Sequence, residues 1–322
     1  MEVTRGIGEW ADSLLEFRRA QGFSGEKYGL YLRSFVSYCS REFPGSREVS
    51  SAAVNGWLDE EAGKGFPGAM PEKATVMRTL GKYILAFGGS AYVLPYKRHG
   101  TRVRYTPHVF SDEELAALFD EIDKATAARP CQQAVKGAYS VLFRLIYTCG
   151  LRPQEGRLAR AQDLDLAAGT LFIREAKFHS ERMVGLSAQM VGLLAKYKRR
   201  LDRALPNSTY LFPKCDGKPV GKHGLADYFH DRWLAANRRL RSGSAPRVRV
   251  YDLRHRFASA VLQKWMDEGR EMYVMLPFLR AYMGHAEMSS TLYYVHLLPE
   301  NMRRSAKVDW AKLNAIVPEV ES

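Results

Sequence analysis

A short basic stretch, residues 91–107, divides the chain into two segments that must fold separately. It contains Pro95, Gly100 and Pro107, which interrupt regular secondary structure. On either side of it, apolar residues recur at the spacing of helices. The 322-residue chain is long enough for two domains of ordinary size. We therefore predict three parts: a helical N-terminal domain over 1–90, an interdomain linker over 91–107, and a second domain with a C-terminal tail over 108–322.

The N-terminal segment has the pattern of a small helical bundle. Tyr28, Leu32 and Phe35, with the residues that follow to Cys39, fall on one face of a helix. Four helices are expected: one around Trp10, one over 28–39, a short one that Ser51 would cap, and one over 76–87.

The second segment reads as mostly helical with one β-hairpin. Ser111 is placed to cap a helix with acidic residues in its first turn. Residues 135–149 form a strongly amphipathic helix, and Gly150 sits where a left-handed residue ends such a helix. Residues 171–173 and 183–186 read as two strands around a tip at 176–181. The predicted fold class is therefore mainly α with a small antiparallel β-sheet, an α+β arrangement.

The charge balance points to a polyanionic partner. There are 48 basic and 35 acidic residues, a formal net charge of +13. Two runs concentrate this charge, one in the linker and one over 238–256. Either run alone could be a solvated loop, but two runs beside candidate catalytic residues favour contacts to a DNA backbone. The candidate DNA-binding residues are Lys97, Arg98, Arg102, Arg104, Arg247 and Arg249.

Several classes of protein are disfavoured by what the sequence lacks. No run approaches the ~18 apolar residues of a membrane helix, and the first residues have no signal-peptide hydrophobic region. The four cysteines are scattered and have no metal-ligand spacing. We expect a soluble, intracellular protein that needs no membrane, metal or cofactor.

Two arginines of the second domain are suited to binding a phosphate. Arg152 lies between Gly150 and Pro153, at a corner between helices, and Glu155 can hold it by a side-chain pair. Arg254 follows Asp252, a candidate helix cap, so its guanidinium would lie beside backbone amides that favour an anion. Each arginine alone could be an ordinary surface or helix-start residue.

A histidine and a tyrosine complete the candidate site. His285 follows Gly284, and Tyr294 comes nine positions after that histidine. In one unbroken helix the two would lie on opposite faces. Ser289 and Ser290 are good capping residues and allow a break that brings the two side chains together. Lys177, between the two strands, could reach into a groove and protonate a departing oxygen.

These spaced segments together resemble the catalytic domain of the tyrosine recombinase (phage-integrase-like) family over about residues 110–298. The resemblance implies that Tyr294, two residues before His296, is the nucleophile, in preference to the adjacent Tyr293. It implies catalytic roles for further residues, which are Arg152 with its supporting Glu155, Lys177 as general acid, Tyr251, Arg254 and His285.

Two segments depart from the family pattern. Tyr251 stands where the family usually has the first histidine of His-x-Leu-Arg-His, and a neutral phenol is a poor base near neutral pH. Proton handling would then shift to Lys177, His285 or water. The hairpin tip also departs from the commoner Lys-Gly-x-Lys pattern, at Phe178 and Ser180.

The resemblance implies a site-specific DNA recombinase or integrase that works through a 3′-phosphotyrosyl intermediate. Its N-terminal domain would be a core-binding (SAM-like) DNA-binding domain, and the two domains would clamp a double-stranded recombination site. Four protomers would act on two sites, with accessory recombinases as further partners, in the cytoplasm of a prokaryote at the nucleoid. The apolar residues Trp310, Leu313 and Val317 of the tail would pack on a neighbouring protomer or on their own domain.

The biological role and two rival functions stay open at this level. The run from Leu276 to His285 looks more like transposon-encoded integrases, which favours integration, excision or transposition of a mobile element. A type IB topoisomerase-like enzyme would share the chemistry on a single duplex. A non-catalytic DNA-binding protein of the same fold is the other alternative, and Tyr251 is its support.

Overall fold

A computed structural model describes residues 5–23, 25–96, 105–124, 130–174, 181–240 and 245–296 of the chain. The chain divides into two compact units, Met1–Tyr105 and Thr106–Ser322. The division falls inside the stretch predicted as a linker. Within the described ranges, no helix is both long and apolar enough to cross a membrane.

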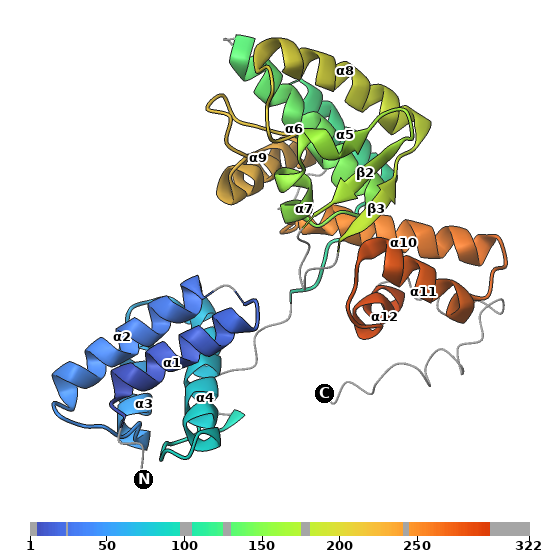
Figure 1. The fold of residues 1–322 in the computed structure, drawn as a ribbon. Helices are drawn as coiled ribbons and strands as arrows, with labels where there is room; N and C mark the ends of the chain where they lie inside the picture. The colour runs from blue at the N-terminus through green and yellow to red at the C-terminus, as the bar shows by residue number, and fades with distance from the viewer. Residues whose placement is uncertain are drawn as a thin grey trace. The chain divides into compact units, whose positions relative to one another are not determined.

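The first unit is a helical bundle, drawn from blue to cyan in Figure 1. Its core surrounds Leu32, Phe35, Trp57 and Leu80, which are fully buried. The Phe35 and Trp57 rings meet edge to face, with 5.6 Å between their centroids. The elements are α1 (Ile7–Ala20), α2 (Glu26–Glu42), α3 (Ser51–Gly63), the 3₁₀ helix η1 (Pro67–Ala69) and α4 (Met70–Ala86).

The cap of α3 is one residue earlier than the sequence predicted. Ser50, not Ser51, has the extended backbone of an N-cap, and its hydroxyl accepts a hydrogen bond from the Ala53 amide at 3.1 Å. Both serines are good caps, so residue type alone could not choose between them. In α5 (Asp112–Asp123), the predicted cap Ser111 does accept a hydrogen bond from the Glu114 amide, and the Glu114 carboxylate accepts one from the Ser111 amide.

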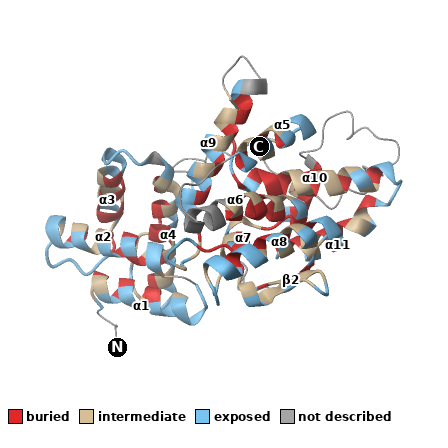
Figure 2. Ribbon diagram, turned by 90° about the horizontal axis from the view of Figure 1, so that it is seen from above, coloured by how far each residue is buried: buried red, intermediate tan, exposed pale blue. Residues whose placement is uncertain are grey.

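The second unit is built around α6, whose buried residues appear in red in Figure 2. This helix packs against α8 and α10, with α5 and α7 also in contact. The helices of the unit are α5 (Asp112–Asp123), α6 (Pro130–Cys149), α7 (Pro153–Leu158), the 3₁₀ helix η3 (Ala161–Asp163), α8 (Ala188–Ala204), α9 (Lys222–Leu240), α10 (Tyr251–Asp267), α11 (Met272–Met283) and α12 (Ser289–His296).

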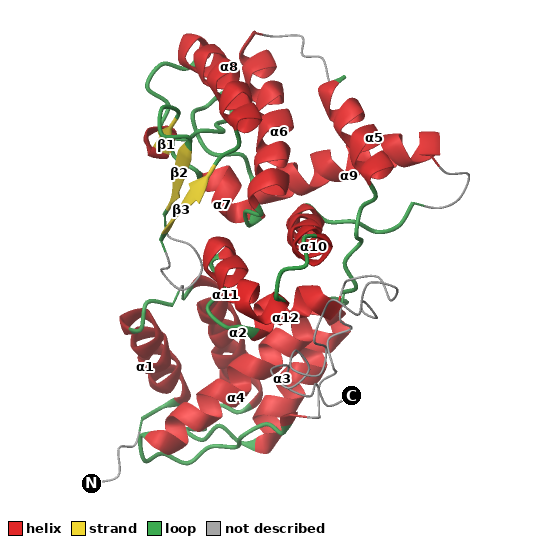
Figure 3. Cartoon of the chain, turned by 90° about the vertical axis from the view of Figure 1, so that its right-hand side faces the viewer, coloured by secondary structure: helices red, strands yellow, loops and turns green. Residues whose placement is uncertain are grey.

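A three-stranded antiparallel sheet lies in the same unit (Figure 3). Its strands, in spatial order, are β1 (Leu164–Asp165), β2 (Thr170–Ile173) and β3 (Arg182–Gly185). Leu171 pairs with Val184, and both side chains are fully buried. β1 is only two residues long and was not predicted. Of the hairpin tip predicted at 176–181, residues 176–180 lie outside the described residues. The predicted fold class, mainly α with a small antiparallel sheet, is confirmed.

Helices α10, α11 and α12 enclose a second, smaller core, and a glycine sets how closely α6 approaches α10. Gly150, after α6, and Gly284, after α11, both have the left-handed backbone that glycine adopts at least cost. A Cβ on Gly150 would lie 2.3 Å from a ring carbon of Phe257 on α10. The end of α6 can therefore approach α10 closely only because residue 150 has no side chain.

Candidate active site

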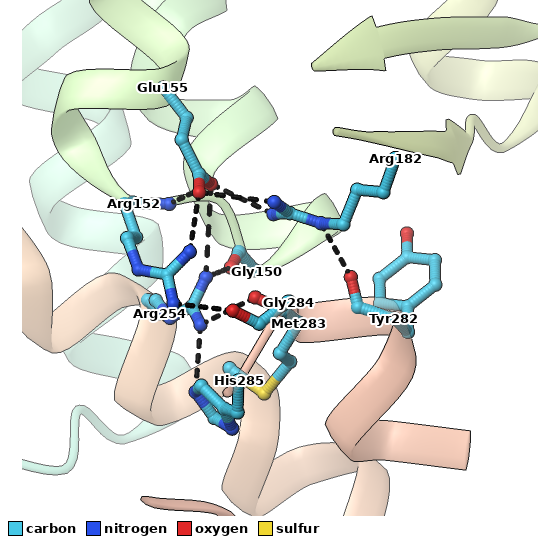
Figure 4. Close-up of polar contacts among 9 residues, drawn as sticks. All are labelled: Gly150, Arg152, Glu155, Arg182, Arg254, Tyr282, Met283, Gly284 and His285. Atoms are coloured by element: carbon cyan, nitrogen blue, oxygen red, sulfur yellow. Dashed lines mark hydrogen bonds and ion pairs between the residues drawn. The ribbon is translucent and has the colours of Figure 1, made fainter. Parts of the chain in front are cut away.

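The candidate site assembles at the C-terminal end of α11, where three consecutive carbonyls accept hydrogen bonds from three arginines (Figure 4). Arg182 donates to the Tyr282 carbonyl and Arg254 to the Met283 carbonyl, each at 2.8 Å. Arg152 donates to the Gly284 carbonyl at 2.7 Å. The last carbonyls of a helix have no partner inside it and carry the negative end of its dipole, so they attract cations.

Arg152 is held on two sides. It is the N-cap residue of α7, and its amide donates to Glu155 Oε2 at 2.9 Å. Its guanidinium donates to Glu155 Oε1 at 2.6 Å while its other terminal nitrogen reaches Gly284. The Pro153 at the first helical position supports this corner. The predicted pairing of Arg152 with Glu155 is therefore present.

Arg254 is completely buried. Its Nη1 donates to the Gly150 carbonyl at 2.6 Å, and its Nη2 contacts His285 Nε2 at 2.8 Å as well as Met283. Within the described residues its Nε has no hydrogen-bond partner. The arginine thus ties α6, α10 and the His285 turn together and keeps one donor for a further acceptor.

Asp252 does not cap α10, contrary to the prediction. The helix begins at Tyr251 with Val250 at its N-cap, so Asp252 occupies the second helical position. From there its Oδ2 accepts a hydrogen bond from the Arg249 amide, just before the helix, at 2.9 Å. Arg254 still falls in the first turns of the helix, as expected.

Arg182 is a site residue that the sequence reasoning missed. It is the first residue of β3, its side chain is only 9% exposed, and it forms a two-nitrogen pair with both oxygens of Glu155 at 3.1 and 2.8 Å. A signal existed in the alternation of the strand: Arg182 lies two residues before the buried Val184 and so shares its inward face. A charged side chain on a buried face requires a partner.

Glu155 is the anionic centre of the arrangement. Burial alone would raise the pKa of its carboxyl group, but hydrogen bonds and charge from Arg182 and Arg152 outweigh burial and lower this pKa to about 2. The carboxylate therefore stays ionised throughout the physiological range and cannot serve as a proton donor there.

His285 is a neutral hydrogen-bond acceptor toward Arg254. Burial, followed by the charge of Arg254, lowers the pKa of this imidazole to about 3. A guanidinium can only donate, so Nε2 accepts from Arg254 and the ring proton is on Nδ1, which donates to the Thr291 hydroxyl at 2.8 Å. In this arrangement both ring nitrogens are engaged, so His285 does not offer a free base to a neighbouring phenol.

Tyr294 lies beside both that histidine and Arg254. The chain breaks between α11 and α12, as predicted, and the two rings stack with 5.7 Å between centroids and 20° between planes. Tyr294 is 2% exposed, whereas the adjacent Tyr293 is partly exposed. Burial raises the pKa of the Tyr294 phenol to about 12, although the charge of Arg254 acts in the opposite direction. The phenol is therefore protonated and covered in this structure.

His255 is a second buried histidine beside the tyrosine. Its ring centroid lies 5.4 Å from that of Tyr294 and 5.1 Å from that of Tyr251. Burial, then the charge of Arg254, lowers its pKa to about 4. Its Nδ1 has no hydrogen-bond partner in the part of the chain that the structure describes. His255 stands at the last position of the pattern His-x-Leu-Arg-His, and the sequence predicted no role for it.

Acidification is expected to destabilise the second unit through these two histidines. Their folded-state pKa values, about 4 and about 3, lie below the ~6.5 of an unfolded histidine. The unfolded chain therefore takes up protons first, so this contribution to stability is complete above pH ~6.5 and is lost as the pH falls toward the folded values. Between pH ~7 and ~5 we expect the free energy of unfolding to fall by roughly 2–4 kcal/mol.

Denaturant unfolding at a series of pH values measures this effect. The His255→Gln variant should show about half the decline of the parent protein, because one of the two buried sites is removed. A free energy of unfolding that is flat between pH ~7 and ~5 would contradict the assignment of neutral, buried histidines.

The remaining predicted residues fall into two groups. Lys177 and the linker residues Lys97, Arg98, Arg102 and Arg104 lie outside the described residues. Tyr251, Arg247 and Arg249 are exposed, and together with Arg152 they line one cavity of about 660 Å³. Arg157 and Lys222 also line it, so this cavity joins the candidate site to a basic surface.

Among the described residues, no cluster of three histidine, cysteine, aspartate or glutamate side chains could hold a metal ion.

The chain is similar to a known protein family and to individual proteins of known sequence. Residues 108–301 match the family model described as the phage integrase family. The integrase/recombinase y4rE, so named in Sinorhizobium fredii, is 28% identical over 297 residues, which cover 90% of this chain and 92% of that protein.

Two solved structures share the fold. The Tn1549 transposon integrase, in complex with a circular intermediate DNA, superimposes with a TM-score of 0.68 at 13% identity over 97% of this chain and all of that one. The XerH site-specific recombinase, bound to a palindromic difH substrate, gives a TM-score of 0.64 at 20% identity over 89% of this chain and 79% of that one.

Proposed function

The chain belongs to the phage integrase family and is a tyrosine-type site-specific DNA recombinase, and on this premise we propose that Tyr294 cleaves DNA through a 3′-phosphotyrosyl intermediate. In the proposed step the Tyr294 oxygen forms a bond to the scissile phosphorus, and the bond from phosphorus to the 5′ oxygen breaks. The phenol loses a proton and the 5′ oxygen gains one. The intermediate keeps the energy of the phosphodiester, so a second 5′ hydroxyl can reverse the step on another strand.

One observation carries this proposal: two buried or half-buried arginines, a histidine and a tyrosine from four separate segments converge at the end of α11. Arg152 and Arg254 are held rigidly, each by two or more hydrogen bonds, as cations must be to stabilise a developing charge without reorganisation. Arg254 retains an Nε donor for a phosphate oxygen. The His285 ring contacts both that arginine and Tyr294.

The proton transfers are assigned by elimination and by resemblance. Lys177, as the predicted general acid, would protonate the 5′ oxygen. His285 is engaged at both nitrogens and Tyr251 is a phenol, so neither supplies an obvious base for Tyr294 in this arrangement. The remaining candidates to accept the proton of the Tyr294 phenol are the neutral His255 beside it and water admitted with the DNA.

The DNA partner and the assembly are also proposals. We infer that the first unit is a core-binding domain and that four protomers act on two double-stranded sites, with accessory recombinases, at the nucleoid in the cytoplasm. The resemblance of Leu276–His285 to transposon-encoded integrases supports a role in integrating, excising or transposing a mobile element. The tail residues Trp310, Leu313 and Val317, outside the described residues, would join neighbouring protomers.

The two exposed arginines of the cavity give a prediction about DNA affinity. If Arg247 and Arg249 neutralise phosphates, Arg247→Ala and Arg249→Ala should each weaken binding to all sequences and reduce the slope of log affinity against log salt by about one. Binding titrations at several salt concentrations measure that slope. Arg270→Ala is the matched control, because Arg270 is exposed but pairs with Glu268 at the far end of α10. An unchanged slope in the cavity variants would remove these residues from the DNA interface.

The proposed function is tested by trapping. Duplexes selected from a randomised pool by binding to the protein would be remade with a nick beside the cleavage point, so that the cleaved fragment is lost and the adduct accumulates. Wild-type protein should give a band of covalent protein–DNA adduct on a denaturing gel and should join strands between two duplexes. Adduct formation with relaxation of one supercoiled duplex but no exchange between two would favour the topoisomerase-like alternative.

A further inference from the structure

Arg182 was not among the residues assigned to the reaction, yet it binds two groups that those residues share, the Glu155 carboxylate and the end of α11. Each of its three nitrogens donates a hydrogen bond inside the protein, one to the Tyr282 carbonyl and two to Glu155. Its side chain is 9% exposed. A guanidinium committed in this way is poorly placed to bind a phosphate itself, so its effect must pass through the groups that it holds.

The first of those groups is the turn that carries His285. Arg182 binds the first of the three carbonyls at the end of α11, and Arg254 and Arg152 bind the next two (Figure 4). Arg182 also packs directly against the glycine of the turn, because a Cβ on Gly284 would lie 2.8 Å from its Nη1. The position of this turn therefore depends on Arg182.

The second group is Glu155, which links all three arginines. Its oxygens accept from Arg152 and from Arg182, and Oε2 lies 3.9 Å from Arg254 Nη1. Without Arg182, the carboxylate would lose two of its donors while remaining buried, and it would be free to shift toward the other two arginines. Displacement of a reacting group by about 1 Å can slow an enzyme by about 10²-fold.

We propose that Arg182 is a positioning residue for strand cleavage. It fixes Glu155 and the Tyr282–Gly284 turn, and these two groups in turn hold Arg152, Arg254 and His285 in the geometry needed for cleavage. This inference rests on the proposed function, since it concerns the rate of the cleavage step. It assigns to the start of β3 a task in the chemistry that neither the motif resemblance nor the candidate residues included.

The test compares single-turnover cleavage rates at saturating DNA with the dissociation constants for the same duplex. Arg182→Ala should slow cleavage by about 10- to 100-fold while the dissociation constant changes by less than about threefold. Arg182→Lys, which keeps the charge but cannot bridge Glu155 and Tyr282 with a planar fork, should give an intermediate rate. Arg174→Ala is the matched control, because Arg174 makes a similar two-nitrogen pair, with Asp163, beside the same sheet. Its side chain is more exposed, and its pair with Asp163 does not involve Glu155.

A second substrate separates positioning of the arginines from an effect on the leaving group. With sulfur in place of the bridging 5′ oxygen, the departing thiolate needs no proton, since thiols ionise near pH ~8.5. If Arg182 acts on the arginines and His285, the Arg182→Ala deficit persists on this substrate. If the sulfur abolishes the deficit, Arg182 acts on the hairpin that carries Lys177 and the proposal is wrong.

The remaining outcomes also decide the question. Equal losses of rate, DNA affinity and melting temperature would mean that Arg182 only supports the fold, and so would an Arg174→Ala variant that is equally slow. If Arg182→Ala does not fold, Arg182→Lys carries the test, and a wild-type rate in that variant would overturn the proposal. Failure of the proposed function looks different, because wild-type protein would then form no covalent adduct on either substrate.

Discussion

Tyr294→Phe is expected to abolish the covalent protein–DNA adduct, a loss of at least about 10³-fold that is limited only by detection. Phenylalanine lacks the oxygen that would bond to phosphorus but keeps the ring that stacks on His285 at 5.7 Å. The variant should therefore stay folded and bind DNA with nearly wild-type affinity. The measurement is the adduct band on a denaturing gel after incubation with the nicked duplex.

Tyr293→Phe is the matched control for this experiment. It removes the same atom from the neighbouring residue, which is partly exposed. An adduct that persists in Tyr294→Phe and disappears in Tyr293→Phe would reverse the assignment of the nucleophile. If wild-type protein binds the duplex tightly and gives no adduct, the non-catalytic alternative gains support, and Tyr251→His becomes the variant to make next.

Arg254→Ala should slow cleavage by about 10² to 10³-fold, the usual effect of removing one preorganised donor to a charged transition state. Arg254 is completely buried and is anchored to Gly150, Met283 and His285, so no other residue can take its place. The same substitution leaves two buried carbonyls without a donor, at a cost of about 1–3 kcal/mol each. Single-turnover cleavage and thermal unfolding, measured on the same preparation, separate the two effects.

Two variants on the same helix make this prediction specific. Arg254→Lys restores the charge and part of the stability but not the planar fork, so its cleavage rate should remain well below that of the wild type. Arg256→Ala removes an arginine two residues away that pairs with the exposed Asp112, and its cleavage rate at saturating DNA should be close to wild type. A near-normal rate in Arg254→Ala would contradict the catalytic assignment.

Much of the architecture could be predicted because its determinants are local. Helical periodicity located α2, α4 and α6, and a glycine at the end of α6 indicated the left-handed residue that the structure has. The argument from helix geometry, that His285 and Tyr294 can meet only across a break, is also local, and the structure has that break. Such inferences need only the spacing of residues along the chain.

The predictions that failed or were missing concern features that residues close in the sequence do not determine. Arg182 meets Glu155 across 27 positions and Tyr282 across 100, and pairings over such distances are set by how the sheet packs on the helices. The start of α3 after Ser50, and of α10 after Val250, depends on where the backbone enters the helix. The polar residues near these positions do not specify that point. The state of Tyr294, covered and protonated, likewise depends on neighbours from three helices.

The covered state of Tyr294 has a consequence for how sharply the protein discriminates between DNA sequences. If Tyr294 is the nucleophile as proposed, its side chain, which is 2% exposed, must be uncovered before it can reach a phosphate, and contacts made with the DNA would have to supply the free energy for that opening. Weakly matched sequences supply less of that free energy, so they are bound without being cut. Fidelity at the level of cleavage then exceeds fidelity at the level of binding, which protects a genome from accidental nicks by a protein whose +13 charge attracts it to any duplex.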